Sequence, residues 1–209
     1  MNIQLIGKEL LLQEMPILYA KPFTAETLKE DFDIRGGEWW VEDGWLIGKN
    51  PHNKPGMIIS RADYFCDTMV DFKARTVLPS THDIDVMWSG SWDYDKNVRD
   101  VAYVAGVEGW YFGKVGIEKC PDHTLNAATQ IFPFEAGKTY HIQAGSAKGH
   151  VFVIIDGKLV LELTDPAPID VTKHGKIGFE AYASHIQITD LVVRQTVFNE
   201  TSASYAPEF

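Results

Sequence analysis

The sequence predicts an all-β protein, a sandwich of two antiparallel sheets with one short N-terminal helix. Runs of β-branched and aromatic residues recur at roughly 10–15 residue intervals, and clusters of Gly, Pro, Asn and Asp separate them. No long helical period lies between these runs, which argues against an α/β fold. The chain has 209 residues and 45% hydrophobic content, enough for one sizeable core. We therefore expect a single domain over residues 1–198 and a frayed tail over residues 199–209.

The elements follow in order along the chain. The convincing helix signal covers residues 24–31, where Thr24 is a suitable N-cap. Two Asp-Gly pairs, Asp43-Gly44 and Asp156-Gly157, are typical of tight hairpins, because both central residues of a type I′ turn need positive φ. The expected strand regions are 38–48, 56–61, 68–76, 82–90, 100–107, 109–118, 138–146, 150–163, 175–182 and 184–198.

Alternation within these strands assigns side chains to an inner or an outer face, because successive residues of a strand point to opposite sides. Tyr140, Ile142 and Ala144 form one such inner set. The outward residues that could carry chemistry are His141, Gln143, Trp110, Lys114, Glu118, Glu180 and Tyr182.

Charge excludes several classes of partner. The chain has 19 Lys+Arg against 29 Asp+Glu, a formal charge of −10, and its basic residues are not clustered. Binding to nucleic acid or to an anionic membrane needs clustered positive charge, so neither is expected. The N-terminus lacks the pattern of a secretory signal, and we expect a cytoplasmic protein.

Cysteine and tryptophan usage is also informative. The two cysteines, Cys66 and Cys120, are far apart and have no metal-binding spacing, so we expect reduced thiols and neither a disulfide framework nor a structural zinc site. All six tryptophans occur in the first 110 residues. Tryptophan rings can stack on the apolar faces of sugars, although many tryptophans belong to cores.

Two blocks of sequence resemble a known superfamily. The first is FDIRGGEWWVEDGWLIGKN with the following MIISR and TMVDFKART, and the second is GKTYHIQAGSAKGHVFVIIDGKLVLELTDP with GKIGFEAYASHIQITDLVVRQ. They resemble the concanavalin A-like lectin/glucanase jelly roll, especially the 3-keto-disaccharide hydrolase (glycoside-hydrolase-16-like) domains and YesU-like proteins. The resemblance covers roughly residues 17–195 and implies a jelly-roll sandwich with its chemistry on the concave sheet face.

One segment departs from the pattern of the laminarinase-like enzymes of this fold. Their E-x-D-x-(x)-E motif supplies a nucleophile first and a general acid last. Here Asp83 matches the first position, Asp85 the middle one and Trp88 the place of the proton donor. The resemblance therefore implies hydrolysis of an activated sugar or β-elimination from a 3-keto sugar or uronide. Elimination needs mainly a base such as His141.

The residues that could carry chemistry fall into a catalytic and a substrate-binding group. The catalytic candidates are His141, Glu118, Tyr182, Lys114 and Asp85, and the substrate-binding candidates are Trp88, Trp92, Tyr94, Trp110, Gln143 and Glu180. Trp92 and Tyr94 belong to a polar, aromatic loop over residues 89–97 that is suited to binding. By resemblance, Asp190 matches a position that holds structural calcium. No nucleotide-binding motif is present, so no other cofactor is expected.

The leading functional hypothesis is a carbohydrate-active protein that cleaves a small glycoside or oligosaccharide. The alternative is a non-catalytic carbohydrate-binding or accessory protein, for which stacking rings and hydrogen-bonding groups suffice. A third interpretation, a purely structural interaction domain, leaves the aromatic loop without a role. The sequence leaves open whether two chains pair along a sheet edge.

Overall fold

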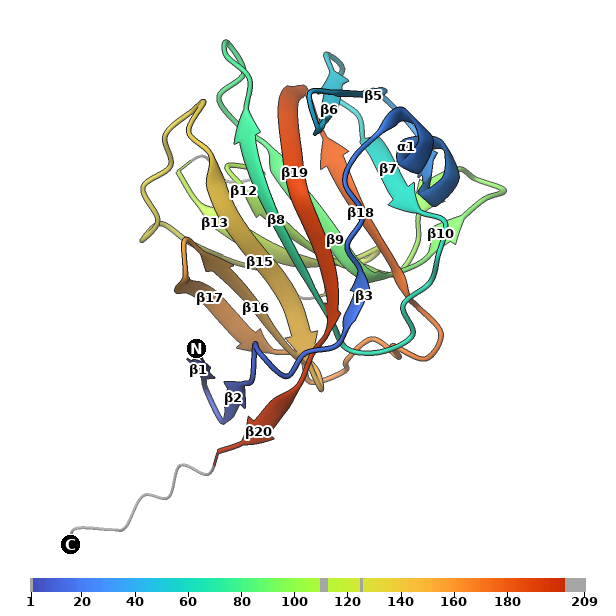
Figure 1. Ribbon diagram of the computed structural model, residues 1–209. Coiled ribbons are helices and arrows are strands. Elements are labelled where there is room, and N and C mark those ends of the chain that lie inside the picture. Colours follow the sequence, from blue (N-terminus) through green and yellow to red (C-terminus); the bar gives the residue numbers. More distant parts are fainter. Residues whose placement is uncertain (1, 110–112, 125, 202–209) are drawn as a thin grey trace, which may run out of the picture.

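Two large antiparallel sheets form the body of the protein, in a computed structural model that describes residues 2–109, 113–124 and 126–201 (Figure 1). The eight-stranded sheet has the spatial order β17 (Lys158–Thr164), β16 (His150–Ile155), β15 (Tyr140–Ala147), β8 (Thr68–Thr76), β19 (Ser184–Gln195), β6 (Trp45–Asn50) and β5 (Glu38–Glu42), and β3 (Ile17–Tyr19) also pairs with β19. The seven-stranded sheet has the order β14 (Asn126–Thr129), β13 (Val115–Cys120), β12 (Ala102–Val107), β9 (Ile84–Gly90), β18 (Lys176–Ala181), β7 (Gly56–Ser60) and β4 (Phe32–Ile34). The predicted fold class is confirmed.

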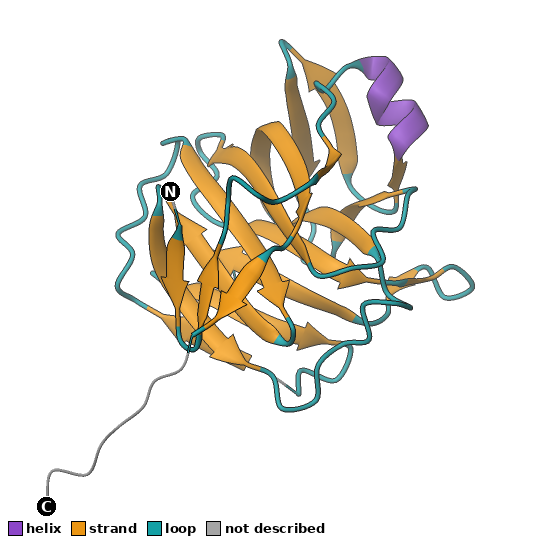
Figure 2. Ribbon diagram, turned by 60° about the horizontal axis from the view of Figure 1, so that its bottom comes forward, coloured by secondary structure: helices purple, strands orange, loops and turns teal. Residues whose placement is uncertain are grey.

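Smaller elements surround this sandwich. The helix α1 (Ala25–Asp31) begins after Thr24, whose side chain accepts a hydrogen bond from the Thr27 backbone N–H in a capping box, as the sequence predicts. It lies at one edge of the molecule (Figure 2). Two short pairings were not predicted: the sheet of β1 (Ile3–Leu5), β2 (Lys8–Leu10) and β20 (Phe198–Glu200), and the hairpin of β10 (Trp92–Asp93) and β11 (Val98–Arg99).

Strand β20 corrects the expected start of the C-terminal tail. Asn199 and Glu200 pair with β2, because Lys8, Glu9 and Leu10 present a free strand edge to them. The prediction that residue 199 begins a frayed tail is therefore wrong. Residues 202–209 of the predicted tail lie outside the described residues.

The two predicted Asp-Gly hairpins are confirmed. Asp43 and Gly44 have φ values of 50° and 77° between β5 and β6, and Asp156 and Gly157 have 50° and 74° between β16 and β17. Aspartate tolerates this region better than most residues and glycine enters it without penalty. Over the residues that the structure describes, no helix is long and apolar enough to cross a membrane.

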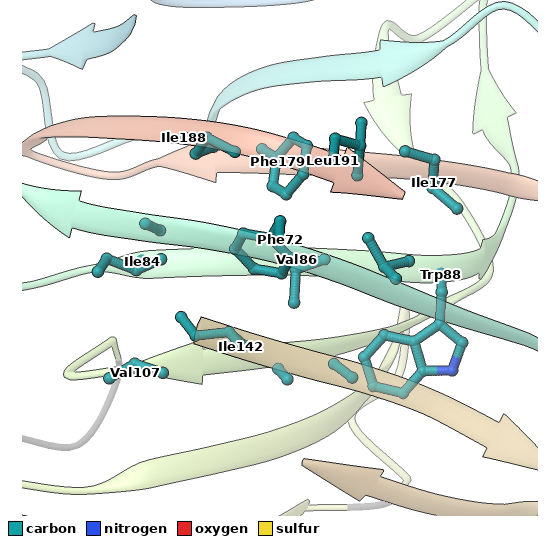
Figure 3. Close-up of a cluster of buried hydrophobic side chains, with 14 of the residues drawn as sticks. Phe72, Ile84, Val86, Trp88, Val107, Ile142, Ile177, Phe179, Ile188 and Leu191 are labelled. Atoms are coloured by element: carbon teal, nitrogen blue, oxygen red, sulfur yellow. The ribbon is translucent and has the colours of Figure 1, made fainter. Parts of the chain in front are cut away.

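The core lies between the inner faces of the two sheets (Figure 3). Alternation places Tyr140, Ile142 and Ala144 of β15 there, as predicted. Trp88 of β9 is also part of this core, fully buried, with its ring centroid 5.7 Å from that of Tyr103. Polar residues of the seven-stranded sheet are consequently left for its outer face, where the functional site is found.

Candidate functional site

Two adjoining cavities hollow the outer face of the seven-stranded sheet. The first, of about 380 Å³, is strongly acidic and is lined by Asp83, Asp85, Glu118, Glu180, Arg99 and Tyr182 among others. The second, of about 460 Å³, contains Trp92, Met57 and Cys120. Pro55, Arg99 and His123 line both cavities. We call the two together the acidic groove.

Strand register explains why the carboxyl groups of the groove meet. Asp85 of β9 lies directly opposite Glu180 of β18, so the two side chains project side by side from the same face. On the other side of Asp85, the same row continues through Gly106 and then Gly116. Both carboxyl groups line the first cavity.

Arg99, from the β10–β11 hairpin, is the positive charge at the centre of the groove. Its Nη1 lies 2.5 Å from Glu180 Oε2, and its Nη2 lies 3.7 Å from Glu118 Oε1. The Arg99 side chain is only 15% exposed, so these contacts are shielded from water. The guanidinium therefore pairs with Glu180 and fixes the orientation of its side chain.

Asp85 is in a different electrostatic state from Glu180. It is 3% exposed, and its Oδ1 has no hydrogen-bond partner among the described residues. Burial, followed by the negative charges of Asp83 and Glu180, raises the pKa of Asp85 well above its ordinary value. The protonated form of Asp85 is thus favoured, and its neighbour Glu180 is instead paired with an arginine.

Asp83 closes the same end of the groove. Its Oδ2 accepts a hydrogen bond of 2.5 Å from the backbone N–H of Tyr182, and the Ser184 hydroxyl lies 3.4 Å from the same oxygen. Burial also raises the pKa of Asp83. Its φ of 75° marks the turn by which the chain enters β9 and delivers Asp85 to the sheet.

A second cluster stands where the two cavities meet. His123 Nδ1 lies 2.8 Å from Glu118 Oε2, and Cys120 Sγ lies 3.5 Å from Glu118 Oε1. One potential ligand atom from each of these residues lies within 4.8 Å of the others, so the trio could hold a metal ion. Burial raises the pKa of the free Cys120 thiol to about 11.

The structure brings together some of the predicted site residues. Asp85, Glu118, Glu180 and Tyr182 all line the first cavity, and Trp92 lines the second. Lys114 immediately precedes β13 and is not among the residues that line either cavity. Trp110 lies outside the described residues.

Other predicted residues lie elsewhere. His141 and Gln143 project from β15 on the outer face of the eight-stranded sheet, where Asp71 bonds both, at 2.6 Å and 2.9 Å. The sandwich separates them from Asp85, so the expectation that His141 acts beside these carboxyl groups is wrong. Asp190 is exposed and pairs with Lys73 at 2.9 Å, and its calcium role stays a prediction.

Trp88 and Tyr94 were both expected to stack on a sugar in the groove. Trp88 does not line the groove: Asp85 and Trp88 are three residues apart in a strand of period two, so they face opposite sides of the sheet. Met87, with Asp85, takes the outer face instead. Tyr94 is 51% exposed in the β10–β11 turn, with the Arg35 guanidinium 4.6 Å from its ring centroid.

Sequence reasoning missed Arg99 and His123. Arg99 occupies a two-residue strand, and His123 lies in a turn beyond β13, so neither belongs to a periodic pattern. The available signal for His123 was its spacing, since Glu118, Cys120 and His123 form an E-x-C-x-x-H sequence. Nothing in the local sequence indicates that Arg99 reaches Glu180.

The fold and site define a galectin-like or concanavalin A-like β-sandwich with a carboxylate-rich groove on one sheet. No family model and no curated protein matches the chain, so the resemblance to 3-keto-disaccharide hydrolases and YesU-like proteins stays a prediction.

Solved structures resemble this fold closely in shape but little in sequence. A protein of unknown function with a galectin-like fold from Bacillus subtilis has a TM-score of 0.66 and 18% identity, over 88% of this chain and 99% of that chain. The carbohydrate binding module CBM66 from Bacillus subtilis has a TM-score of 0.64 and 15% identity, over 79% and 96%. A putative glycosyl hydrolase from Parabacteroides distasonis has a TM-score of 0.51 and 12% identity, over 85% and 99%. At these identities the likeness concerns the fold alone.

Proposed function

We propose that this protein hydrolyses a glycosidic bond of a small, uncharged glycoside or oligosaccharide bound in the acidic groove. The observation that carries this proposal is the pairing of two unlike carboxyl groups on adjacent strands: Asp85, buried and without a partner for Oδ1, and Glu180, ion-paired to Arg99. Glycoside hydrolysis needs one protonated and one ionised carboxyl group on either side of the scissile bond.

Each of the two residues has a role that its surroundings support. Asp85 is the general acid, because burial and neighbouring negative charge favour its protonated form. Glu180 is the carboxylate that acts as nucleophile or base, because its ion pair with Arg99 fixes its position opposite Asp85. Side chains directly opposite on antiparallel strands have Cβ atoms about 4.5–5.5 Å apart. Opposite positions on adjacent strands therefore allow both carboxyl groups to reach the same bound sugar.

The charge of the groove supports an uncharged substrate. Asp83, Asp85, Glu118 and Glu180 line the first cavity together with only one arginine. Every carboxyl group that ionises there repels an anion in a site with little screening. A uronide is therefore a poor substrate, and elimination from one is disfavoured. Elimination also loses its expected base, since His141 lies on the other sheet.

Binding without catalysis is the second candidate function, and the Arg99 contacts favour it. Arg99 is bonded to Glu180 and close to Glu118, so the three form a rigid set of donors and acceptors of the kind that binds sugar hydroxyls. The likeness to a carbohydrate-binding module is compatible with this function, but concerns the fold.

Turnover of nitrophenyl glycosides, each compared with its 3-keto counterpart, tests the proposal. Asp85→Asn and Glu180→Gln should each lower kcat by about 10²–10⁴-fold, the usual contribution of a general acid or base. Asp190→Asn is the matched control, because Asp190 is an exposed carboxylate on the other sheet.

The outcomes separate the two candidate functions. Turnover that survives both groove substitutions refutes the assigned roles. If no glycoside is turned over, titration of the same sugars decides: binding that is lost in Glu180→Gln and kept in Asp190→Asn indicates a binding protein. Binding that is unaffected by Glu180→Gln places the ligand outside the groove.

A further inference from the structure

We propose that Glu118, Cys120 and His123 form a three-ligand site for a borderline-soft divalent cation such as Zn²⁺, with its remaining coordination position open to the acidic groove. This inference is independent of glycoside hydrolysis, because it concerns what the groove binds and not what it cleaves. It rests on the placement of the three donor groups, on their chemistry, and on a buried oxygen of Asp85 that has no partner in the adjoining cavity.

The chain places the three donors in one spot by local geometry. Glu118 and Cys120 are two residues apart in β13, so their side chains project from the same face of the sheet. After Pro121 the chain turns back, and His123 adopts a positive φ of 51°. This turn brings the imidazole over the strand it has just left, where Nδ1 meets Glu118.

The spacing of the donor atoms is close to that of a tetrahedral metal site. Metal–ligand bonds of about 2.0–2.3 Å at tetrahedral angles separate donor atoms by about 3.3–3.8 Å. The distance from Cys120 Sγ to Glu118 Oε1 is 3.5 Å, and the donor atoms of the trio lie within 4.8 Å of one another. For a metal to bind, the 2.8 Å contact between His123 Nδ1 and Glu118 Oε2 must lengthen. The His123 side chain is 55% accessible, so it can make this shift.

The adjoining cavity offers a further observation. Glu118 and His123 share this cavity with Asp83, Asp85, Glu180 and Arg99, and the guanidinium of Arg99 is already paired with Glu180. Asp85 adds an independent indication, since its buried Oδ1 faces this cavity without a partner among the described residues. A buried polar oxygen with no partner is costly, and a water bound to the metal would satisfy such an atom.

The donor types select the class of metal. A thiolate and an imidazole prefer Zn²⁺ and other late divalent ions, whereas Ca²⁺ and Mg²⁺ prefer oxygen ligands alone. Glu118 and His123 line the first cavity, and Cys120 and His123 the second. A metal held between them has protein ligands on one side and the groove on the other. Three protein ligands with an open fourth position are typical of zinc sites that bind a substrate or water.

Titration of the whole chain with Co²⁺ and Zn²⁺ tests this site. Co²⁺ should produce a thiolate-to-metal charge-transfer band in the near ultraviolet, and one equivalent of Zn²⁺ should remove it. Cys120→Ser should abolish the band, while Cys66→Ser, which changes the other cysteine, should leave it intact. His123→Gln should weaken Zn²⁺ affinity by about 10–100-fold.

Three outcomes of these experiments overturn the proposed metal site. A charge-transfer band that is absent from the parent, or that persists in Cys120→Ser, overturns the proposal. Equal Zn²⁺ affinity of the parent and His123→Gln also overturns it, and because His123 is exposed this variant should fold normally. Urea unfolding of each variant identifies any loss that comes from misfolding. The spectroscopic readout does not involve glycoside turnover, so failure of the metal site and failure of the proposed hydrolysis are observed separately.

Discussion

Replacing Asp85 by Asn should stabilise the protein, by an amount that grows as the pH rises. Asp85 lies opposite Glu180 across β9 and β18, at a typical Cβ separation of about 5 Å. If Asp85 ionised, two unit charges at that distance would repel by about 3 kcal/mol at an effective dielectric constant of about 20, in addition to the cost of burying the charge, so in the folded protein the cost is met by keeping the proton. Attraction to Arg99 offsets part of this repulsion. We therefore expect the free energy of unfolding of Asp85→Asn to exceed that of the parent by about 1–3 kcal/mol at pH 8.

The sign of the pH dependence follows from the raised pKa of Asp85. The folded protein retains the Asp85 proton at pH values where the unfolded chain has lost it. Folded-state stability of the parent therefore falls as the pH rises from about 4, the ordinary aspartate value, through the raised pKa of the folded state. The asparagine variant lacks this contribution, so its advantage is smallest near pH 4.

Urea unfolding, followed by tryptophan fluorescence at pH 5 and pH 8, measures this difference. The slope of free energy against urea should stay the same, since the substitution leaves the buried area unchanged. A variant that is less stable than the parent, or whose advantage is equal at both pH values, would refute the electrostatic argument. A stabilised but inactive variant would show that the groove sacrifices stability for chemistry.

Three further substitutions test other parts of the structure. Trp88→Ala should cost about 3–5 kcal/mol of folding stability with no direct effect on binding, whereas Trp92→Ala should lower both stability and ligand affinity, because Trp92 is 8% exposed in an apolar cluster and also lines the second cavity; thermal melts and sugar titration compare them. His141→Gln should cost at most about 0.5 kcal/mol at pH 5.5, because the side chain is 41% exposed. Asp71 raises the pKa of His141, so this cost should vanish as the pH rises through that pKa; a cost that grows with pH contradicts it. Thr24→Ala removes the helix cap and should cost about 0.5–2 kcal/mol, and an unchanged melting temperature would argue against the cap.

Local patterns in the sequence were sufficient for the architecture. Each of the ten predicted strand regions overlaps at least one strand of five or more residues, because a strand half-buried in a sandwich must alternate apolar and polar residues. The Thr24 cap and the two Asp-Gly turns were also readable, since each depends on the conformational preferences of one or two residues. Short edge strands such as β20 were missed, because three residues are too few to show a period.

Alternation also predicted that Glu118 and Glu180 face outward from their strands. Trp88 was expected in the groove and lies in the core instead, where the same period, applied from Asp85, places it. What alternation alone leaves undetermined is which outward residues share a sheet. His141 and Glu118 are both outward, yet they lie on opposite faces of the sandwich. Only the pairing of strands distant in the sequence decided that Asp85 meets Glu180 and that Arg99 reaches Glu180 on β18 and Glu118 on β13. Such pairings depend on how whole sheets close around a common core, and for that reason the site emerged only from the tertiary structure.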